Sequence, residues 1–533
     1  MKYQSTRGGV SGYTFEQAVL EGLAPDGGLF IPQSIPELPA NWATEWRDLS
    51  FEALAVRIFR LFIDESEIST TDLTDLVHQS YRTFRHPEVT PVRPLYAPDA
   101  SERLWLLELF HGPTFAFKDV ALQFLGNLFE YFLARRNQHD PEGHHHITVV
   151  GATSGDTGSA AIYGLRNKKN VQVFILHPKG RVSPIQEAQM TTVLDANIHN
   201  VAVQGTFDDC QDIVKALFGD ASFRTTYQLG AINSINWARI LAQTVYYFYS
   251  YFAVNRQVSQ ASVTAPRIIY TVPTGNFGDV LAGFYARQLG LPIHRLVVAT
   301  NANDILYRFF ATGRYEKASE ADGQGGAGDH SAVKATHSPA MDILVSSNFE
   351  RLLWYLAYDH AVSGPEYDGT SRAMAAGKLI NDWMYEFKST GRLVVPSAVH
   401  QAAAAMFDSV AVSNQATLDT IRKYHTSAPT KPSYLLDPHT AVGIKAAEVL
   451  TARNPTEYQE AYNVCLSTAH PAKFSGAVTE ALTAGGATFA FDEVLPPQFV
   501  GLLEKPRRCL DASPGTTANV KQTIETTLAS ISS

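Results

Sequence analysis

His111-Gly112-Pro113-Thr114-Phe115-Ala116-Phe117-Lys118-Asp119 places one lysine at the end of a short, apolar, turn-rich segment. An amphipathic run follows at once, with Val120, Phe124 and Leu128 at helical spacing. Lys118 is therefore expected in the first turn of a helix, where the helix dipole and the neighbouring phenylalanine rings disfavour an ammonium group. Schiff-base chemistry needs a lysine of lowered pKa, because only the neutral amine attacks a carbonyl. A surface lysine that extends past its phenylalanines is the alternative on this segment alone.

The composition limits the classes of protein that fit the chain. Its 533 residues are too many for one hydrophobic core, so two or three domains are expected. The net charge of -9 argues against nucleic acid and anionic membranes as partners. Three cysteines without a C-x-x-C pair argue against a disulfide scaffold or a zinc ribbon. With no signal peptide and no long apolar run, we expect a cytoplasmic protein, either a monomer or a small homo-oligomer.

From residue 147 onward the chain alternates between short apolar runs and amphipathic segments. This pattern predicts parallel sheets covered by helices, an α/β fold. The expected strands are residues 147–150, 171–176, 197–203, 268–272 and 294–299. The first ninety or so residues and the region 341–414 are expected to be mainly helical, and 513–533 to hold a short surface helix. Residues 323–329, rich in glycine, predict a flexible exposed loop.

Two loops have the composition of anion sites. Gly151-Ala152-Thr153-Ser154-Gly155-Asp156-Thr157-Gly158 and Pro273-Thr274-Gly275-Asn276-Phe277-Gly278-Asp279 each follow an expected strand and precede an expected helix. Glycines let backbone N–H groups converge there, and the helix end adds partial positive charge. Neither loop is a Walker or a dinucleotide-binding motif. Each alone fits a tight turn without a ligand, but both together with the Lys118 motif are a much rarer combination.

That combination resembles the fold-type II pyridoxal-phosphate enzymes, the tryptophan-synthase-β-like family. More narrowly, the chain is similar to the threonine synthase family in its fungal and enterobacterial subgroup. The resemblance extends over nearly the whole chain. The segments that carry it are residues 3–8, 22–29, 110–119, 151–158, 233–239, 273–279, 341–351 and 467–474.

The resemblance implies a division into three parts. An N-terminal domain would span residues 1–95, a smaller cofactor-fold domain residues 96–225, and a larger one residues 226–533. The cofactor would lie in the cleft between the two sheet domains. No metal is implied, and His144-His145-His146 is expected to be a solvated loop cluster, because no cysteine or carboxylate stands at ligand spacing.

The resemblance also assigns cofactor-binding residues. Lys118 matches the Schiff-base lysine, and Thr468 matches the residue that faces the pyridine nitrogen. Asp156 falls beside the cofactor's 3-oxygen, where the wider family usually has asparagine; an anion facing a phenolate must be offset by a proton or a cation. The backbone that holds the cofactor phosphate would come from Gly275, Asn276, Phe277, Gly278 and Asp279. Without the resemblance, Thr468 also fits a strand-end residue in a turn bounded by proline.

The remaining assignments concern the substrate. Ser154, Gly155 and Thr157 match the loop that takes the substrate α-carboxylate. The segment Asn233-Ser234-Ile235-Asn236-Trp237-Ala238-Arg239 separates this family from other fold-type II enzymes, and its Asn233, Ser234 and Arg239 match residues that bind the substrate's phosphate. An arginine fork with two neutral donors suits a phosphate dianion. A capped helix start with a surface arginine is the alternative for this segment.

The activity implied by the resemblance is the conversion of O-phospho-L-homoserine and water to L-threonine and phosphate, the last step of threonine biosynthesis. Phosphate would leave from Cγ, water would add at Cβ, and Lys118 would carry protons. Two alternatives stay open at this point: a phospho-lyase that releases 2-oxobutyrate from the same substrate, and a non-catalytic relative that binds the cofactor. A generic dehydratase is disfavoured, because it has no use for the phosphate-binding segment.

Overall fold

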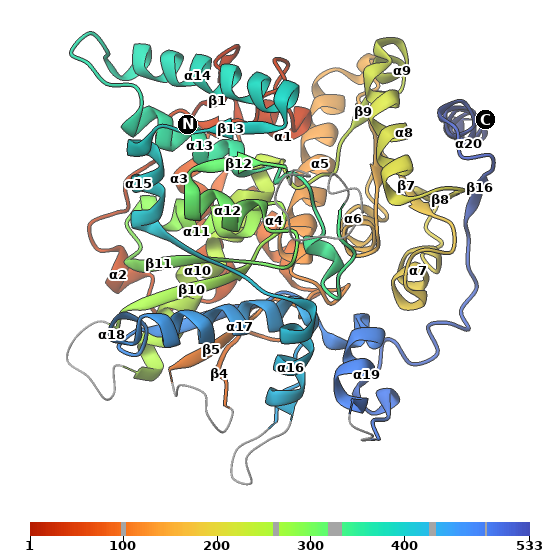
Figure 1. Ribbon diagram of the computed structural model, residues 1–533. Coiled ribbons are helices and arrows are strands. Elements are labelled where there is room, and N and C mark those ends of the chain that lie inside the picture. Colours follow the sequence, from red (N-terminus) through yellow and green to blue (C-terminus); the bar gives the residue numbers. More distant parts are fainter. Residues whose placement is uncertain (97–102, 259–265, 318–332, 426–432, 485–487, 533) are drawn as a thin grey trace.

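Two sheets with helices packed around them organise the chain (Figure 1). The structure is a computed structural model that describes residues 1–96, 103–258, 266–317, 333–425, 433–484 and 488–532. The glycine-rich loop expected at residues 323–329 lies outside these ranges. The α/β class predicted from the alternating pattern is confirmed.

The smaller sheet has the strand order β16-β8-β7-β6-β9, and all of its strand pairs are parallel. Its strands are β6 (Ile147–Ala152), β7 (Val171–Pro178), β8 (Ile198–Val203), β9 (Leu229–Gly230) and β16 (Leu510–Ala512). The helices of this half are α6 (Asp156–Leu165), α7 (Pro184–Thr191), α8 (Phe207–Gly219), α9 (Ala221–Thr226) and α20 (Thr517–Ser532). Strand β8 is buried along its whole length and β6 over its first four residues, as expected for a parallel sheet covered on both faces.

The larger sheet has the order β14-β11-β10-β15-β5-β4, parallel except for the β4–β5 pair. Its strands are β4 (Val92–Pro94), β5 (Leu104–Glu108), β10 (Ile268–Pro273), β11 (Ile293–Thr300), β14 (Phe407–Ala411) and β15 (Tyr462–Ser467). The helices associated with it are α10 (Trp237–Val258), α11 (Gly278–Leu289), α12 (Ile305–Thr312), α13 (Phe349–His360), α14 (Gly369–Thr390), α15 (Ser397–Met406), α16 (Asn414–His425), α17 (Pro438–Arg453), α18 (Pro455–Tyr458) and α19 (Ser475–Thr483).

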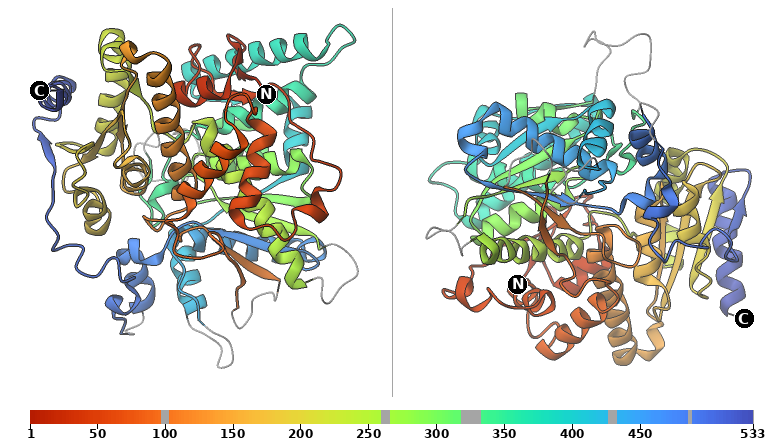
Figure 2. Two further views of the ribbon diagram at one scale, coloured as in Figure 1. Left: turned by 180° about the vertical axis from the view of Figure 1, so that it is seen from behind. Right: turned by 90° about the horizontal axis from the view of Figure 1, so that it is seen from below.

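Sheet membership does not follow the contiguous ranges 96–225 and 226–533 that the sequence suggested. Strand β5 lies before the smaller sheet in the chain but pairs with β15 in the larger sheet. At the other end of the chain, β16 returns to the smaller sheet and pairs with β8. Figures 1 and 2 show this last segment running from α19 to α20, on the side of the smaller sheet. The return covers a sheet edge whose N–H and C=O groups would otherwise lack partners.

The N-terminal part lies behind the larger sheet in the view of Figure 1 and faces the reader in the left view of Figure 2. It contains α1 (Phe15–Glu21), α2 (Trp42–Glu45), α3 (Phe51–Phe62) and α4 (Thr70–Tyr81). It also contains a small antiparallel sheet of β1 (Tyr3–Ser5), β2 (Ser11–Tyr13) and β3 (Phe30–Pro32). The part is therefore mainly helical, as expected, with the small sheet as an addition.

Residues 341–414 are mainly helical, as expected, but two short strands interrupt the helices. Helices α13, α14 and α15 are present, but β13 (Arg392–Val394) pairs with β12 (Arg314–Glu316), and β14 extends the larger sheet beyond β11. The buried side chains of Phe407 and Val410 pack on the core, and pairing with β11 satisfies the backbone of this short segment. The C-terminal helix was predicted correctly, as α20.

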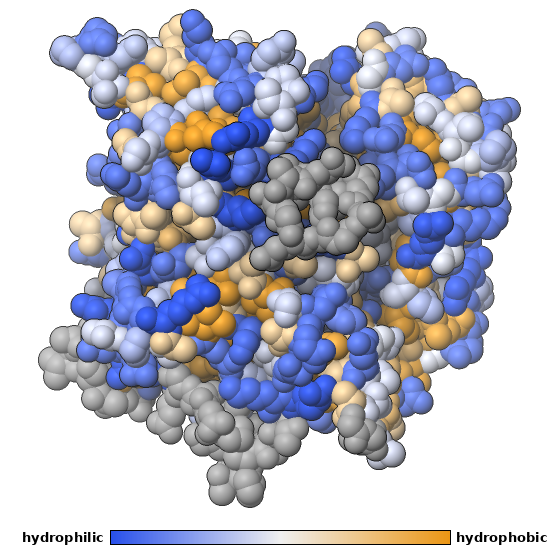
Figure 3. All heavy atoms as spheres, viewed as in Figure 1, coloured by the Kyte–Doolittle hydropathy of each residue, from blue (hydrophilic) through white to orange (hydrophobic). Residues whose placement is uncertain are grey.

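Helix α10 forms the centre of the core. Its side chains from Trp237 to Val254 are all buried, so the aromatic run at residues 245–252 belongs to the core. Hydrophilic side chains cover most of the face in Figure 3, with hydrophobic groups scattered between them, which is ordinary for protein surfaces. Among the described residues, no helix combines the length and apolar character that crossing a membrane requires.

Candidate active site

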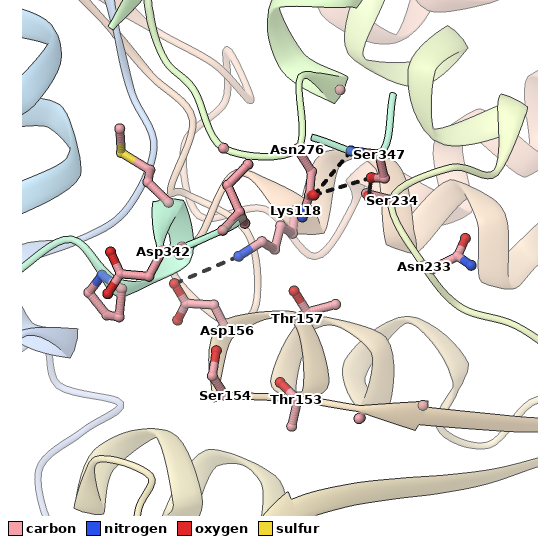
Figure 4. Close-up of a pocket in the computed structure, with 18 of the residues that line it drawn as sticks. Lys118, Thr153, Ser154, Asp156, Thr157, Asn233, Ser234, Asn276, Asp342 and Ser347 are labelled. Atoms are coloured by element: carbon pink, nitrogen blue, oxygen red, sulfur yellow. Dashed lines mark hydrogen bonds and ion pairs between the residues drawn. The ribbon is translucent and has the colours of Figure 1, made fainter. Parts of the chain in front are cut away.

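A cavity of about 580 Å³ lies where the carboxyl ends of strands from both sheets meet. Its walls come from the loops after β5, β6, β10 and β15, the position where open parallel sheets bind ligands. Every site residue predicted from the sequence lines this cavity except Gly155. Figure 4 shows Lys118 reaching across it, with Asp156 on one side and Asn276 and Ser347 on the other.

Helix α5 begins at Lys118, as the sequence predicted, and runs to His139. The loop before it is fixed by Asp119, whose buried carboxylate accepts hydrogen bonds from the backbone N–H and the hydroxyl of Thr114, both at 2.7 Å. The N–H of Phe117 donates to the carbonyl of Thr468 at 2.8 Å. The lysine is thus held from two sides, by its own helix and by the segment after β15.

The environment of Lys118 favours its neutral form. The pKa of its amine is lowered to about 8: burial has the largest effect, the carboxylate of Asp156 opposes it, and Lys473 and Arg239 add to the lowering. The side chain keeps 13% of its surface exposed, and its Nζ lies 4.0 Å from Oδ2 of Asp156. An amine of this pKa is partly neutral near pH 7, so it can act as a nucleophile and can carry protons.

Asp156 is a buried carboxylate with a full set of partners. Its Oδ1 accepts hydrogen bonds from Nζ of Lys473 and Nε2 of Gln186, both at 2.8 Å. Burial alone would raise the pKa of Asp156, but Lys473 and then Lys118 lower it well below its usual range. The carboxylate is therefore ionised. An anion beside the cofactor's 3-oxygen was expected to need a proton or a cation to offset it, and Lys473 is that cation.

The loop between β6 and α6 is organised by Thr153. Its hydroxyl oxygen accepts hydrogen bonds from the N–H groups of Gly155 at 2.9 Å and Gly158 at 2.8 Å. Gly155 has φ +144°, and a Cβ there would lie 2.6 Å from the side chain of Gln186, so only glycine fits. Gly155 thus shapes the loop, and its N–H is already bonded, whereas Ser154 and Thr157 line the cavity.

The loop between β10 and α11 packs tightly on a second segment, residues 340–348. A Cβ on Gly275 would lie 2.9 Å from the carbonyl oxygen of Ala340. Ser346 donates to the carbonyl of Gly275 at 2.8 Å, and Ser347 donates to Oδ1 of Asn276 at 3.2 Å. The loop is rigid, and the first N–H groups of α11, which begins at Gly278, lack partners within the helix.

Two residues of this loop direct their side chains into the core. The ring of Phe277 packs against Phe349, 5.2 Å between ring centroids. The carboxyl group of Asp279 accepts hydrogen bonds from the hydroxyls of Tyr246 and Tyr247, and burial raises its pKa to about 7. Both residues therefore anchor the loop through their side chains and offer backbone to the cavity.

Arg239 is a buried cation at the cavity wall. Only 3% of its surface is exposed, and its Nε and Nη1 have no hydrogen-bond partner among the described residues. Burial lowers its pKa to about 10, which still leaves it charged. Nearby, Asn233 is exposed and forms a turn through its Oδ1 to the N–H of Ile235, and the hydroxyls of Ser234 and Ser347 lie 3.1 Å apart. A buried guanidinium without a counter-charge indicates an anionic ligand.

Sequence reasoning named several of these segments without assigning all of their functional side chains. Lys473 lies in segment 467–474, and Ser346 and Ser347 lie in segment 341–351, both of which carry the family resemblance. A basic or hydroxyl side chain inside such a segment could have been considered as a site residue. Gln186 lies on α7 outside every quoted segment, and no local pattern distinguishes it.

The histidine cluster lies in a loop at the surface. His144 is exposed, His145 lies 3.2 Å from a carboxylate oxygen of Asp140, and His146 contacts the carbonyl of His144. Within the part of the chain that the structure describes, no group of three or more His, Cys, Asp or Glu side chains is arranged to hold a metal ion.

Comparison with known families accounts for most of the chain. Residues 2–81 match the family described as "Threonine synthase N terminus", 83–362 match "Pyridoxal-phosphate dependent enzyme", and 440–524 match "Threonine synthase, C-terminal". The chain belongs to the threonine synthase family. A curated threonine synthase from Schizosaccharomyces pombe is 53% identical, with 99% of this chain and 98% of that protein covered.

Solved structures of threonine synthases agree with the fold. The crystal structure of threonine synthase from yeast is 49% identical and covers 99% of both chains with a TM-score of 0.89. A threonine synthase from Brucella melitensis with bound pyridoxal phosphate is 37% identical, with a TM-score of 0.82 over 99% of both chains. The family and fold predicted from the motifs are confirmed, and the family is pyridoxal-phosphate dependent.

The residues present fit this cofactor. A lysine of lowered pKa lies in a cavity of sufficient volume, and a rigid glycine loop presents a helix N-terminus to it. Arg239, whose Nε and Nη1 have no hydrogen-bond partner in the part of the chain that the structure describes, adds a second place for an anion.

Proposed function

We propose that the protein converts O-phospho-L-homoserine and water to L-threonine and phosphate. The observation that carries this proposal is Arg239, a buried guanidinium with two unpartnered nitrogens in the wall of the cavity that holds Lys118. An amino acid without a second anionic group would leave this charge unpaired, at a cost of several kcal/mol. A phosphorylated substrate supplies the missing anion.

The substrate has an anion at each end, and the cavity has a matching group for each. Ser154 and Thr157, at the start of α6, are assigned to the α-carboxylate, where the helix N-terminus favours negative charge. Arg239, Asn233 and Ser234 are assigned to the phosphate. Two fixed ends hold the carbon chain in one orientation, which lowers the entropic part of the barrier.

The cofactor assignment uses the remaining residues of the wall. Lys118 would carry the cofactor, the backbone of residues 275–279 would hold its phosphate, and Thr468 would be placed at its pyridine nitrogen. Pyridoxal phosphate, when bound, supplies an electron-withdrawing ring conjugated with the amino group of the substrate. A threonine hydroxyl can donate a hydrogen bond to a ring nitrogen but cannot keep it protonated as a carboxylate would.

Lys118 is the proton carrier of the reaction. Its amine, with a pKa of about 8, changes protonation state at little cost near neutral pH. In the proposed sequence it takes protons from Cα and Cβ as the Cγ–O bond to phosphate breaks. It returns one proton to Cγ and, after water adds at Cβ, one to Cα. The amine points toward Asp156, whose Oδ2 lies 4.0 Å away (Figure 4).

The test is product analysis. The purified protein, saturated with pyridoxal phosphate, is incubated with O-phospho-L-homoserine, and the products are identified by chromatography. Threonine with an equal amount of phosphate supports the proposal. Release of 2-oxobutyrate and phosphate would instead indicate the phospho-lyase alternative, and no phosphate release would indicate a non-catalytic relative.

A further inference from the structure

Lys473 is a buried cation that the proposed reaction does not yet use. It lies in a short 3₁₀ helix, Pro471–Lys473, directly after the segment that contacts the Lys118 loop. Its side chain is fully buried, and its Nζ donates to Oδ1 of Asp156 and to the carbonyl oxygen of Thr114, both at 2.8 Å. A buried ammonium group is retained only where such partners compensate its lost hydration.

The two carboxylate oxygens of Asp156 have different partners. Oδ1 is occupied by Lys473 and by Gln186. Oδ2 faces Nζ of Lys118 at 4.0 Å (Figure 4). The carboxylate therefore cannot rotate away from Lys118 without breaking two hydrogen bonds, so Lys473 and Gln186 fix its orientation.

We propose that Lys473 is a positioning residue, the fixed counter-cation that keeps Asp156 ionised and aimed at Lys118, so that Lys118 can release its proton without leaving a buried carboxylate unpaired. With Lys473 present, the pair with Asp156 is neutral by itself. Without Lys473, Lys118 would be the nearest cation to Asp156. The pKa of Lys118 would then be higher, because its positive charge would be needed to compensate the carboxylate.

The other charged groups near this cluster do not replace Lys473. Arg239 and Asp119 also act on Lys118, but Asp119 bonds to Thr114. His439 acts on Asp156 from α17, and its Nδ1 lies 3.0 Å from a carboxylate oxygen of Asp437. Among the described residues, only Lys473 and Lys118 come within 4.0 Å of the carboxylate as cations.

The first experiment measures Lys118 directly. In full-length protein freed of cofactor, the rate at which added pyridoxal phosphate is captured is followed by absorbance from pH 6 to 10. Only the neutral amine reacts, so the midpoint of the rate profile reports Lys118. In Lys473→Met the midpoint should move to higher pH by about one unit, because a neighbouring positive charge is removed. Lys473→Arg, which keeps the charge, should restore most of the wild-type profile.

A matched control separates this effect from general damage. Lys168 also forms a partly buried ion pair, 3.0 Å from Glu130, but outside the cavity. Lys168→Met should leave the capture profile unchanged. A profile in Lys473→Met that stays in place or moves to lower pH would overturn the proposal.

The second experiment tests the pairing without any cofactor. Thermal unfolding of the cofactor-free full chain is compared for Asp156→Asn, Lys473→Met and the double variant. Lys473→Met leaves Asp156 with only the more distant Lys118 as a cation, and Asp156→Asn leaves the buried Lys473 without a counter-anion, whereas the double change removes this closer ion pair as a whole. The double variant should therefore melt above Lys473→Met, and its loss should be well below the sum of the single losses. Additive losses, or a double variant that folds no better than Lys473→Met, would contradict the pairing.

The inference rests on the assignment of Lys118 as the cofactor lysine, and it does not depend on the substrate. If product analysis showed no threonine, both experiments would keep their expected outcomes. If the capture profile and the unfolding cycle failed while threonine formed normally, only the role of Lys473 would be lost.

Discussion

Replacing Arg239 by methionine separates its effect on stability from its effect on substrate use. The guanidinium is buried, and burial alone lowers its pKa from 12.5 to about 10. At 1.36 kcal/mol per pH unit, this difference corresponds to about 3 kcal/mol of destabilisation while the group is charged. Because the folded-state pKa lies below the unfolded value, the cost is fully present at neutral pH and is lost only as the pH rises past about 10.

Arg239→Met should therefore stabilise the ligand-free protein. We expect about 1–3 kcal/mol in urea unfolding at pH 7, since methionine retains most of the aliphatic packing. Inorganic phosphate should raise the melting temperature of the wild type more than that of the variant, because it binds only where the guanidinium is present. With O-phospho-L-homoserine, kcat/KM should fall roughly 30- to 5,000-fold, from the loss of about 2–5 kcal/mol of charge-assisted bonding.

Arg351 provides a control for which we expect the opposite change in stability. It is also fully buried with a pKa lowered to about 10, but its guanidinium donates to the carbonyl of Phe30 at 3.0 Å, to Oδ1 of Asn348 at 2.6 Å and to the carbonyl of Ile235 at 2.6 Å. Arg351→Met should destabilise the protein, because those acceptors lose their donor. The reasoning is refuted if Arg239→Met destabilises the protein as Arg351→Met does, or if phosphate stabilises Arg239→Met as much as the wild type.

Three further outcomes follow from the site. Lys118→Ala should lose the visible absorption of the bound cofactor and nearly all turnover; activity within about tenfold of the wild type, or roughly 1.4 kcal/mol of barrier, would exclude it as the essential amine. Thr468→Asp should keep the pyridine nitrogen protonated, slow threonine formation and raise the share of 2-oxobutyrate at matched cofactor occupancy, whereas an unchanged product ratio would limit Thr468 to packing. Replacing His144, His145 and His146 by alanine, or adding a chelator, should leave activity near the wild-type value, and chelator inhibition reversed by zinc would show a metal role for these histidines.

Much of the site could be predicted because its parts are local. The start of α5 at Lys118 follows from helical periodicity and from the turn-rich segment before it. The loops after β6 and β10 are recognisable because glycines, small polar residues and a following helix are neighbours in the chain. Each of these features depends on interactions over a few residues, which one stretch of sequence contains.

Long-range pairing accounts for what could not be predicted. Nothing near Asp156 in the chain indicates that Lys473 and Gln186 hold its carboxylate, and nothing near Asp279 indicates the tyrosines of α10. The exchange of β5 and β16 between the two sheets likewise depends on strand edges that exist only once the sheets have formed.

The sequence by itself determined the residue types and the local geometry of the site: an amine at a helix start, two loops for anions and an arginine. Only the tertiary structure decided which charge faces which. The free energy of a buried charge depends on its distance from other charges and on its loss of water, and both are set by residues far apart in the chain. That is why, within the described ranges, Arg239 has no carboxylate partner while Asp156 has two cations.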